Sequence, residues 1–339
     1  MPLIIKIILL IGFAILFFFG FLPYIIQMYF PTFALFARRR FYEKNENLQS
    51  KYESGEFKNE NNIKSNLKFT EVFKVLVLMI RRKSSTKPKI RIPVEQLEKD
   101  FFDEKSENLE IVWLGHSSVL IKIDKKTILF DPSLSKYASP FWFANRRFCD
   151  IPIDLKDNFN IDIVVYSHDH YDHLDYQTFK KIKTKTSKFI SPLGVAPILE
   201  LWGLERYRNI EMDWWQEIEI DGLKIICTPA QHFSGRSMGQ RNKSLWASFV
   251  VIGKNKKIFF SGDGGYGNHF RQIGFKYGPF DLTMIECGQY NELWKQIHLM
   301  PEETAKAHKD LRGKYLLPIH WSAFALSTHK WNEPMDRLE

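Results

Sequence analysis

A histidine-rich segment, residues 167–175, constrains the fold of this chain more than any other part of its sequence. It follows residues 161–166, an apolar and β-branched run that predicts a buried strand. The loop after such a strand is where α/β folds usually place their chemistry. This loop offers ligands in the spacing His-x-His-x-Asp-His, namely His168, His170, Asp172 and His173. Imidazole and carboxylate groups both suit Zn²⁺, and ligands this dense cannot all reach one tetrahedral ion, so the loop predicts two neighbouring metals.

Three later strand-like runs each end just before another ligand-type residue: His232, Asp263 or His320. Taken singly, each has a structural alternative: a hydrogen-bonded core histidine, a carboxylate stabilising a glycine-rich turn, and a histidine capping a strand. Because all three follow a strand directly, their shared position favours one common site.

The motif at residues 168–173 is similar to the signature of the metallo-β-lactamase superfamily of hydrolases. Gly-His-Ser-Ser at residues 115–118, followed by Phe-Asp-Pro at 130–132, resembles the opening of its lactonase-like branch. The closer resemblance is to the N-acyl-phosphatidylethanolamine phospholipase D group, through the blocks at residues 213–216, 228–236, 300–303 and 319–326. This resemblance runs in order from about residue 108 to residue 338. It implies an α/β architecture, the metallo-β-lactamase fold, an αββα sandwich of two mixed sheets flanked by helices.

The resemblance also implies two Zn²⁺ ions per chain and assigns seven ligands to them. One ion takes His168, His170 and His232, the other takes Asp172, His173 and His320, and Asp263 bridges the two. Asp172 and Asp263 are therefore candidate catalytic residues as well as ligands.

Three further residues match positions that line the site in the resembled group. His298 and His308 are candidates to hydrogen-bond the phosphate or the leaving group, although a histidine on a surface helix is the alternative for each. Asp131 matches a position near the metals, where it would fix ligand geometry. Gly264 departs from the group, which usually has Thr at that position, so a hydroxyl that tunes the site is missing.

In the resembled group, water attacks the phosphodiester of an N-acylated phosphatidylethanolamine, and the products are phosphatidic acid and an N-acylethanolamine. The resemblance therefore implies a membrane-anchored, zinc-dependent phosphodiesterase of phospholipase D type. Two alternatives stay open: a zinc hydrolase of a soluble substrate, such as a lactone or a phosphorylated sugar, and a nuclease. The nuclease requires an RNA-binding insertion, and none is found between residues 108 and 339.

The amino-terminal part predicts a membrane anchor. No charged side chain occurs from Ile7 to Ala37, and a helix needs about 20 apolar residues to cross a bilayer. Residues 1–37 therefore predict a single transmembrane span that ends near Pro23 or is kinked, followed by an interfacial segment. A cleaved signal peptide is the alternative, but the apolar run is too long for one. The basic residues at 38–40 place the following domain on the cytoplasmic side by the positive-inside rule.

Residues 38–107 predict a basic and polar linker with an amphipathic helix, ahead of a catalytic domain at residues 108–339. Within the linker, residues 41–66 are polar and predict a tether with little core of its own. The apolar run from Phe69 to Ile80 predicts a helix that either lies at the membrane interface or packs on the domain.

Net charge and cysteine content limit the kinds of partner and of cysteine site that we expect. The net charge of +9 is compatible with lipid or nucleic acid, and the anchor favours lipid. We therefore expect a phospholipid substrate and a membrane as partners but no nucleic acid, and a homodimer stays open. The three cysteines are odd in number and widely spaced, which excludes a disulfide framework and a cysteine-rich zinc site.

An aromatic loop at residues 139–147 follows Asp131-Pro132 and should emerge on the same face as the metals. Phe141, Trp142 and Phe143 cannot all point inward from one loop, so at least one is predicted to contact acyl chains or the membrane interface. Arg146 or Arg147 would then lie near phosphate. The alternative is that the loop folds back over the core.

Overall fold

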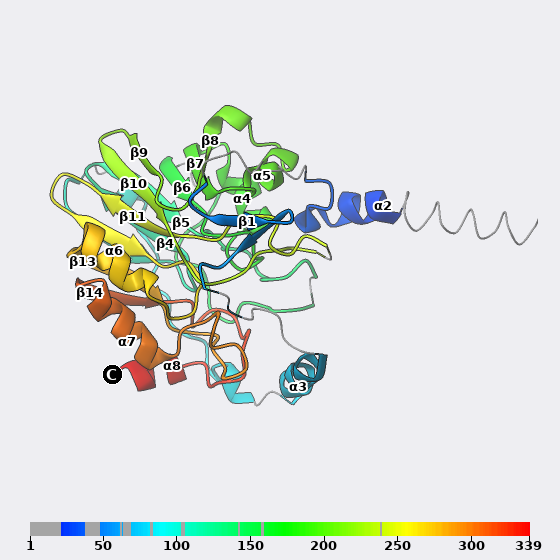
Figure 1. Cartoon of the computed structure of the whole chain (residues 1–339). Coiled ribbons are helices and arrows are strands. Elements are labelled where there is room, and N and C mark those ends of the chain that lie inside the picture. Colours follow the sequence, from blue (N-terminus) through cyan, green and yellow to red (C-terminus); the bar gives the residue numbers. More distant parts are fainter. Residues whose placement is uncertain are drawn as a thin grey trace, which may run out of the picture.

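Two six-stranded mixed sheets form the centre of the protein in the computed structural model (Figure 1). The structure describes residues 22–37, 48–61, 63, 69–81, 84–102, 106–141, 143–156, 159–237 and 239–339. The apolar side chains on the facing sides of the two sheets make one buried core. The rings of Phe130 and Phe260, one from each sheet, stack across this core with centroids 4.7 Å apart.

The first sheet has the strand order β3-β4-β5-β6-β7-β8. Its strands are Glu110–Trp113, Val119–Ile123, Lys126–Phe130, Ile161–Val165, Thr186–Pro192 and Asn209–Met212. β3, β4 and β5 pair antiparallel, whereas β5 to β8 run parallel. The run at 161–166 is thus a buried central strand, as its apolar and β-branched composition predicts.

The second sheet has the order β14-β13-β12-β11-β10-β9. Its strands are Glu217–Ile220 (β9), Leu223–Thr228 (β10), Ser248–Ile252 (β11), Lys257–Phe260 (β12), Phe280–Glu286 (β13) and Gly313–Ile319 (β14). β9 to β12 pair antiparallel, and β12, β13 and β14 run parallel. Consequently β10, β12 and β14 all end at the same edge of this sheet.

Helices cover the outer faces of both sheets. On the first sheet lie α4 (Tyr176–Ile182) and α5 (Ala196–Leu201). On the second lie α6 (His269–Tyr277) and α7 (Pro301–Asp310), with α8 (Glu333–Leu338) beside α7. Short 3₁₀ turns occur at Pro31–Phe33 (η2), Ser84–Thr86 (η3), Lys99–Phe102 (η4) and Arg206–Arg208 (η5). The predicted αββα sandwich is confirmed.

The segment expected to be a loose tether packs into the domain over residues 48–61. It forms a hairpin of β1 (Lys51–Glu53) and β2 (Glu56–Lys58), and the side chain of Phe57 is fully buried in the core between the sheets. The expectation of little core is therefore wrong for this part of the linker. A single large aromatic residue in a polar sequence supplies the burial that composition alone does not reveal.

Two further helices precede the sandwich: α2 (Leu22–Tyr29), at the right in Figure 1, and α3 (Phe69–Ile80), at the lower right. α3 confirms the helix predicted at those residues. Most of the predicted membrane span lies in residues 1–21, outside the described residues. Within the part of the chain that is described, no helix has the length and apolarity to cross a bilayer.

We predict that Phe57→Ala destabilises the protein by about 3–5 kcal/mol, because it empties a filled position in the core. Phe275→Ala is the matched control, since that ring is 85% exposed on α6, and should change stability by no more than about 0.5 kcal/mol. Denaturant unfolding of the two variants measures the difference. If Phe57→Ala destabilised the protein no more than Phe275→Ala does, the hairpin would contribute nothing to the stability of the fold.

Candidate metal centre

Each of the seven predicted ligands lies just beyond the carboxyl end of a strand. His168, His170, Asp172 and His173 occupy the loop between β6 and α4, while His232 follows β10, Asp263 follows β12 and His320 follows β14. The stacked rings of Phe130 and Phe260 end β5 and β12 and join the two sheets at this edge. The fold thereby gathers ligands from both sheets at one place.

The first predicted ligand group is close together. His170 Nδ1 lies 2.9 Å from His168 Nε2 and 3.2 Å from His232 Nε2. Ring nitrogens that converge in this way from three separate side chains are the arrangement expected of ligands to one metal ion.

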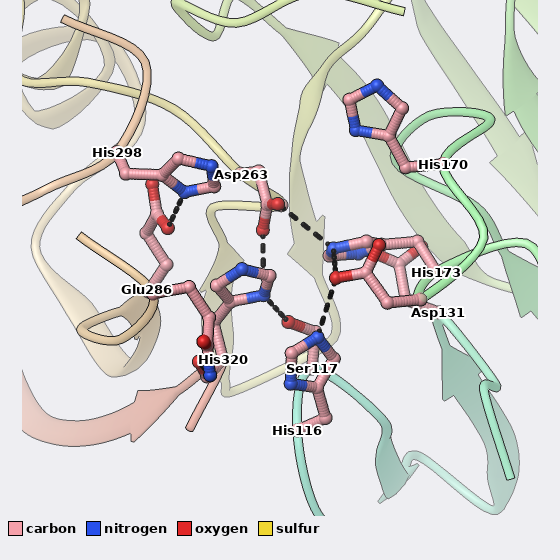
Figure 2. A network of polar contacts seen from close by, with 12 residues as sticks. His116, Ser117, Asp131, His170, His173, Asp263, Glu286, His298 and His320 are labelled. Atoms are coloured by element: carbon pink, nitrogen blue, oxygen red, sulfur yellow. Dashed lines mark hydrogen bonds and ion pairs between the residues drawn. The ribbon is translucent and has the colours of Figure 1, made fainter. Parts of the chain in front are cut away.

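The second group lies beside the first, and Asp263 lies between them (Figure 2). Asp263 Oδ2 is 3.0 Å from His173 Nε2 and 3.9 Å from His168 Nε2, and Asp263 Oδ1 is 3.1 Å from His320 Nδ1. One carboxylate thus reaches residues of both groups. This is the position required of a bridging ligand.

Burial keeps most of these imidazoles neutral, which is the form that binds metal. It lowers the pKa to about 3 for His170, and well below the usual value for His168, His232 and His320. His173 is different: burial alone would lower its pKa, but Asp263, Asp172 and Asp131 raise it well above the usual value. These three carboxylates stabilise positive charge at the centre, as a metal cation requires.

Among the described residues, two buried atoms of the predicted ligands have no hydrogen-bond partner: His173 Nε2 and Asp263 Oδ1. They are within ion-pair distance of other ligands but lack hydrogen-bond geometry. Buried polar atoms normally find a partner. The buried His and Asp clusters therefore fit a binuclear metal site, with the donor types that zinc prefers.

Asp131 lies where it orients a ligand. Its Oδ2 accepts from His173 Nδ1 at 2.7 Å, and its Oδ1 accepts from the backbone N of Ser167 at 2.7 Å. This hydrogen bond to Nδ1 turns the other ring nitrogen of His173 toward Asp263. The geometry agrees with the role that the resemblance implies for Asp131.

The two remaining histidine candidates lie in different places. His298 belongs to the cluster of Asp263, Glu286 and His320, with its ring 5.4 Å from that of His320. His308 lies on α7 and contacts Thr283 Oγ1 through Nδ1 at 2.7 Å. The structure therefore brings His298 to the centre and does not bring His308 there.

Glu286, at the end of β13, is a site residue that sequence reasoning missed. Its buried carboxylate accepts from His298 Nδ1 at 2.8 Å and from the backbone N of Gly264 at 2.7 Å. Burial raises its pKa well above the usual value. Glu286 thus links the turn after Asp263 to the ring of His298. The sequence signal that could have identified Glu286 is a carboxylate at the end of an apolar strand.

Two more supporting residues were missed. His116 Nε2 donates to Asp172 Oδ2 at 2.8 Å, and burial lowers the pKa of His116 to about 4; the Gly-His-Ser-Ser motif was the signal. Asn59 pairs with the backbone of His232, donating to its carbonyl at 2.9 Å and accepting from its N–H at 3.0 Å. No sequence pattern points to Asn59, because this contact is formed only when the hairpin docks.

Comparison with known proteins agrees with this geometry. The family model described as the Beta-lactamase superfamily domain matches residues 126–321. A Mycobacterium tuberculosis protein known only as uncharacterized is 40% identical over 265 residues, which cover 77% of this chain and 70% of that protein. The chain belongs to the metallo-β-lactamase superfamily and is a metal-dependent hydrolase.

Two further similarities are informative. N-acyl-phosphatidylethanolamine-hydrolyzing phospholipase D 1 of Caenorhabditis elegans is 34% identical over 262 residues, which cover 73% of each chain. The solved structure of a metallo hydrolase from Ignicoccus hospitalis superposes with a TM-score of 0.52 at 23% identity, over 68% of this chain and 90% of that one. The latter supports the fold alone.

We predict about two zinc ions per purified chain. Asp263→Asn should reduce metal content and lower turnover by more than about 100-fold, because it removes the charge shared by both ligand groups. Asp221→Asn is the matched control, since Asp221 is an exposed partner of Lys126. Elemental analysis measures the metal. An active preparation without any transition metal would contradict the assignment.

Proposed function

We propose that this protein is a membrane-anchored, zinc-dependent phosphodiesterase of phospholipase D type. Its substrates would be lipids like N-acyl-phosphatidylethanolamine, and its products phosphatidic acid and an N-acylethanolamine. The observation that carries the proposal is the position of Asp263 between two ligand groups, because a paired-metal site suits the displacement of a phosphate ester by water. The similarity to the worm phospholipase supports the choice of lipid.

The residues that would hold the two zinc ions are those of the two groups described above, with Asp263 shared. When bound, the ions would lower the pKa of water and neutralise charge on the phosphate oxygens. The protein contributes orientation: Asp131 fixes His173, and His116 fixes Asp172. Rigid support of this kind keeps ligands in place without further reorganisation.

His298 is the residue we propose for contact with the substrate. Glu286 holds its Nδ1, and its other ring nitrogen lies on the side of Asp263 (Figure 2). The other ring nitrogen of a neutral histidine held in this way can take a proton from the attacking water, and the ring can then pass a proton to the departing alcohol oxygen. His308 is not part of this proposal, because its contact with Thr283 lies elsewhere.

We further propose that residues 1–37 anchor the enzyme as a single-pass membrane protein with its catalytic domain on the cytoplasmic side. The uncharged run from Ile7 to Ala37 and the basic residues at 38–40 support this arrangement. An anchor would raise the local concentration of a bilayer substrate at the enzyme.

We predict that the purified protein, incubated with a mixed lipid extract, consumes N-acyl-phosphatidylethanolamines and releases phosphatidic acid and N-acylethanolamine in equal amounts. In water enriched in heavy oxygen, the label should enter phosphatidic acid, because the bond between phosphorus and the alcohol oxygen is broken. Mass spectrometry measures both results, with Asp263→Asn as the inactive control. Unchanged lipids together with hydrolysis of a lactone would favour the soluble-substrate alternative.

We also predict that His298→Ala lowers turnover by about 100-fold or more and that Glu286→Gln lowers it by about tenfold or more. The double variant should be no worse than His298→Ala alone, because Glu286 acts through the His298 ring. Metal content, measured on the same preparations, should stay unchanged. If the two losses of turnover multiplied in the double variant, Glu286 would act independently of His298.

A further inference from the structure

Aromatic side chains from two distant parts of the sequence form one surface, here called the aromatic rim: Phe30, Phe33, Phe141 and Phe143. The ring of Phe141 lies 5.4 Å from that of Phe143, 5.7 Å from that of Phe33 and 6.3 Å from that of Phe30. Phe143 is 70% exposed, whereas Phe141 is 40% exposed and Phe30 is 36% exposed. A contiguous exposed apolar patch usually marks an interaction site.

The aromatic rim is attached firmly to the metal-binding loop. The ring of Phe33 packs edge-on against Tyr171 at 6.4 Å. Arg236 donates through Nε to the carbonyl of Thr32 at 2.9 Å and through Nη1 to that of Leu174 at 2.8 Å. Thr32 lies between Phe30 and Phe33 in the sequence, and Leu174 directly follows the ligand His173. The buried guanidinium of Arg236 therefore holds the aromatic rim beside the metal centre.

A basic cavity of about 450 Å³ lies at the end of the loop at residues 139–147, which carries Phe141 and Phe143. Its charged lining consists of Lys87, Arg91, Arg146, Arg147 and Asp150. Arg147 is buried and donates to the carbonyls of Ser133 and Ser135, so it is structural rather than free for phosphate. Lys87 and Arg146 are exposed, and Asp150 neutralises only Arg91. The cavity therefore carries an excess of positive charge three residues after Phe143.

We propose that the aromatic rim and the basic cavity together dock onto an anionic phospholipid bilayer. Aromatic rings favour the membrane interface, and exposed basic side chains favour anionic head groups. The sequence ahead of the rim supports this partner, because it is uncharged from Ile7 onward and leads into α2, where Ile25 is also exposed. α3, which lies at the lower right in Figure 1, also exposes Phe73 and Ile80.

This surface deepens the proposed function by naming where the enzyme meets its lipid, and it rests on that function only for the choice of a bilayer substrate. Docking would place the metal centre next to the head groups. Trp142 lies outside the described residues and is not needed for the argument.

The test uses the full-length protein reconstituted into vesicles. A polarity-sensitive dye is attached to Phe143→Cys or, as matched control, to Phe275→Cys on α6. Lipids with brominated acyl chains should quench the dye at position 143 and leave that at position 275 unaffected. Absence of quenching at position 143 overturns the proposal. The proposal is also overturned if the dye emission shifts with protein concentration in the absence of brominated lipid, because a second copy of the protein would then cover the rim.

The basic cavity is tested on the same labelled protein in vesicles of phosphatidylcholine with or without phosphatidylserine. Arg146→Glu should lower the docking equilibrium constant on phosphatidylserine vesicles by about fivefold. Arg271→Glu is the control, since Arg271 is 77% exposed on α6. Equal effects of the two variants overturn the role of the cavity. Quenching without any lipid hydrolysis would retain the docking surface and remove the proposed function instead.

Discussion

The carboxylates of Asp131, Asp172 and Asp263 surround the fully buried ring of His173. Charged groups in such a place are costly unless they compensate one another. Each carboxylate comes from a different segment: Asp131 follows β5, Asp172 lies after β6, and Asp263 follows β12 of the other sheet. The same charge compensation therefore joins the two sheets and prepares a place for cations. The surrounding neutral imidazoles supply donors without adding further charge.

The amino-terminal segments complete this centre from outside the sandwich. Asn59 satisfies both backbone groups of His232, so the β1–β2 hairpin supports a ligand directly. Arg236 connects Thr32 to the loop that carries four other ligands. Thr32 and Asn59 thus belong to the structure that supports the metal centre. Residues 32 and 59 therefore lie close to the metal centre although more than a hundred residues separate them from its ligands.

The turn after Asp263 is closely packed at Gly264. At Gly264, an added Cβ would lie 3.1 Å from the backbone N of Gln231, which is a tight contact. Instead, the Gly264 N–H donates to Glu286, and Glu286 in turn holds His298. Glu286 therefore connects the turn that carries Asp263 to the ring of His298.

The sequence alone determined the strands, because apolar β-branched runs are local signals, and it determined the ligand types, because His-x-His-x-Asp-His is a local spacing. The superfamily and the sandwich were implied by the resemblance of these motifs to a known family. Only the tertiary structure decided that Glu286 and Asn59 support the site while His308 lies apart, since each depends on contacts between segments distant in sequence. It likewise decided that Phe57 is core and Phe143 is exposed, because composition does not specify which side of a loop packs.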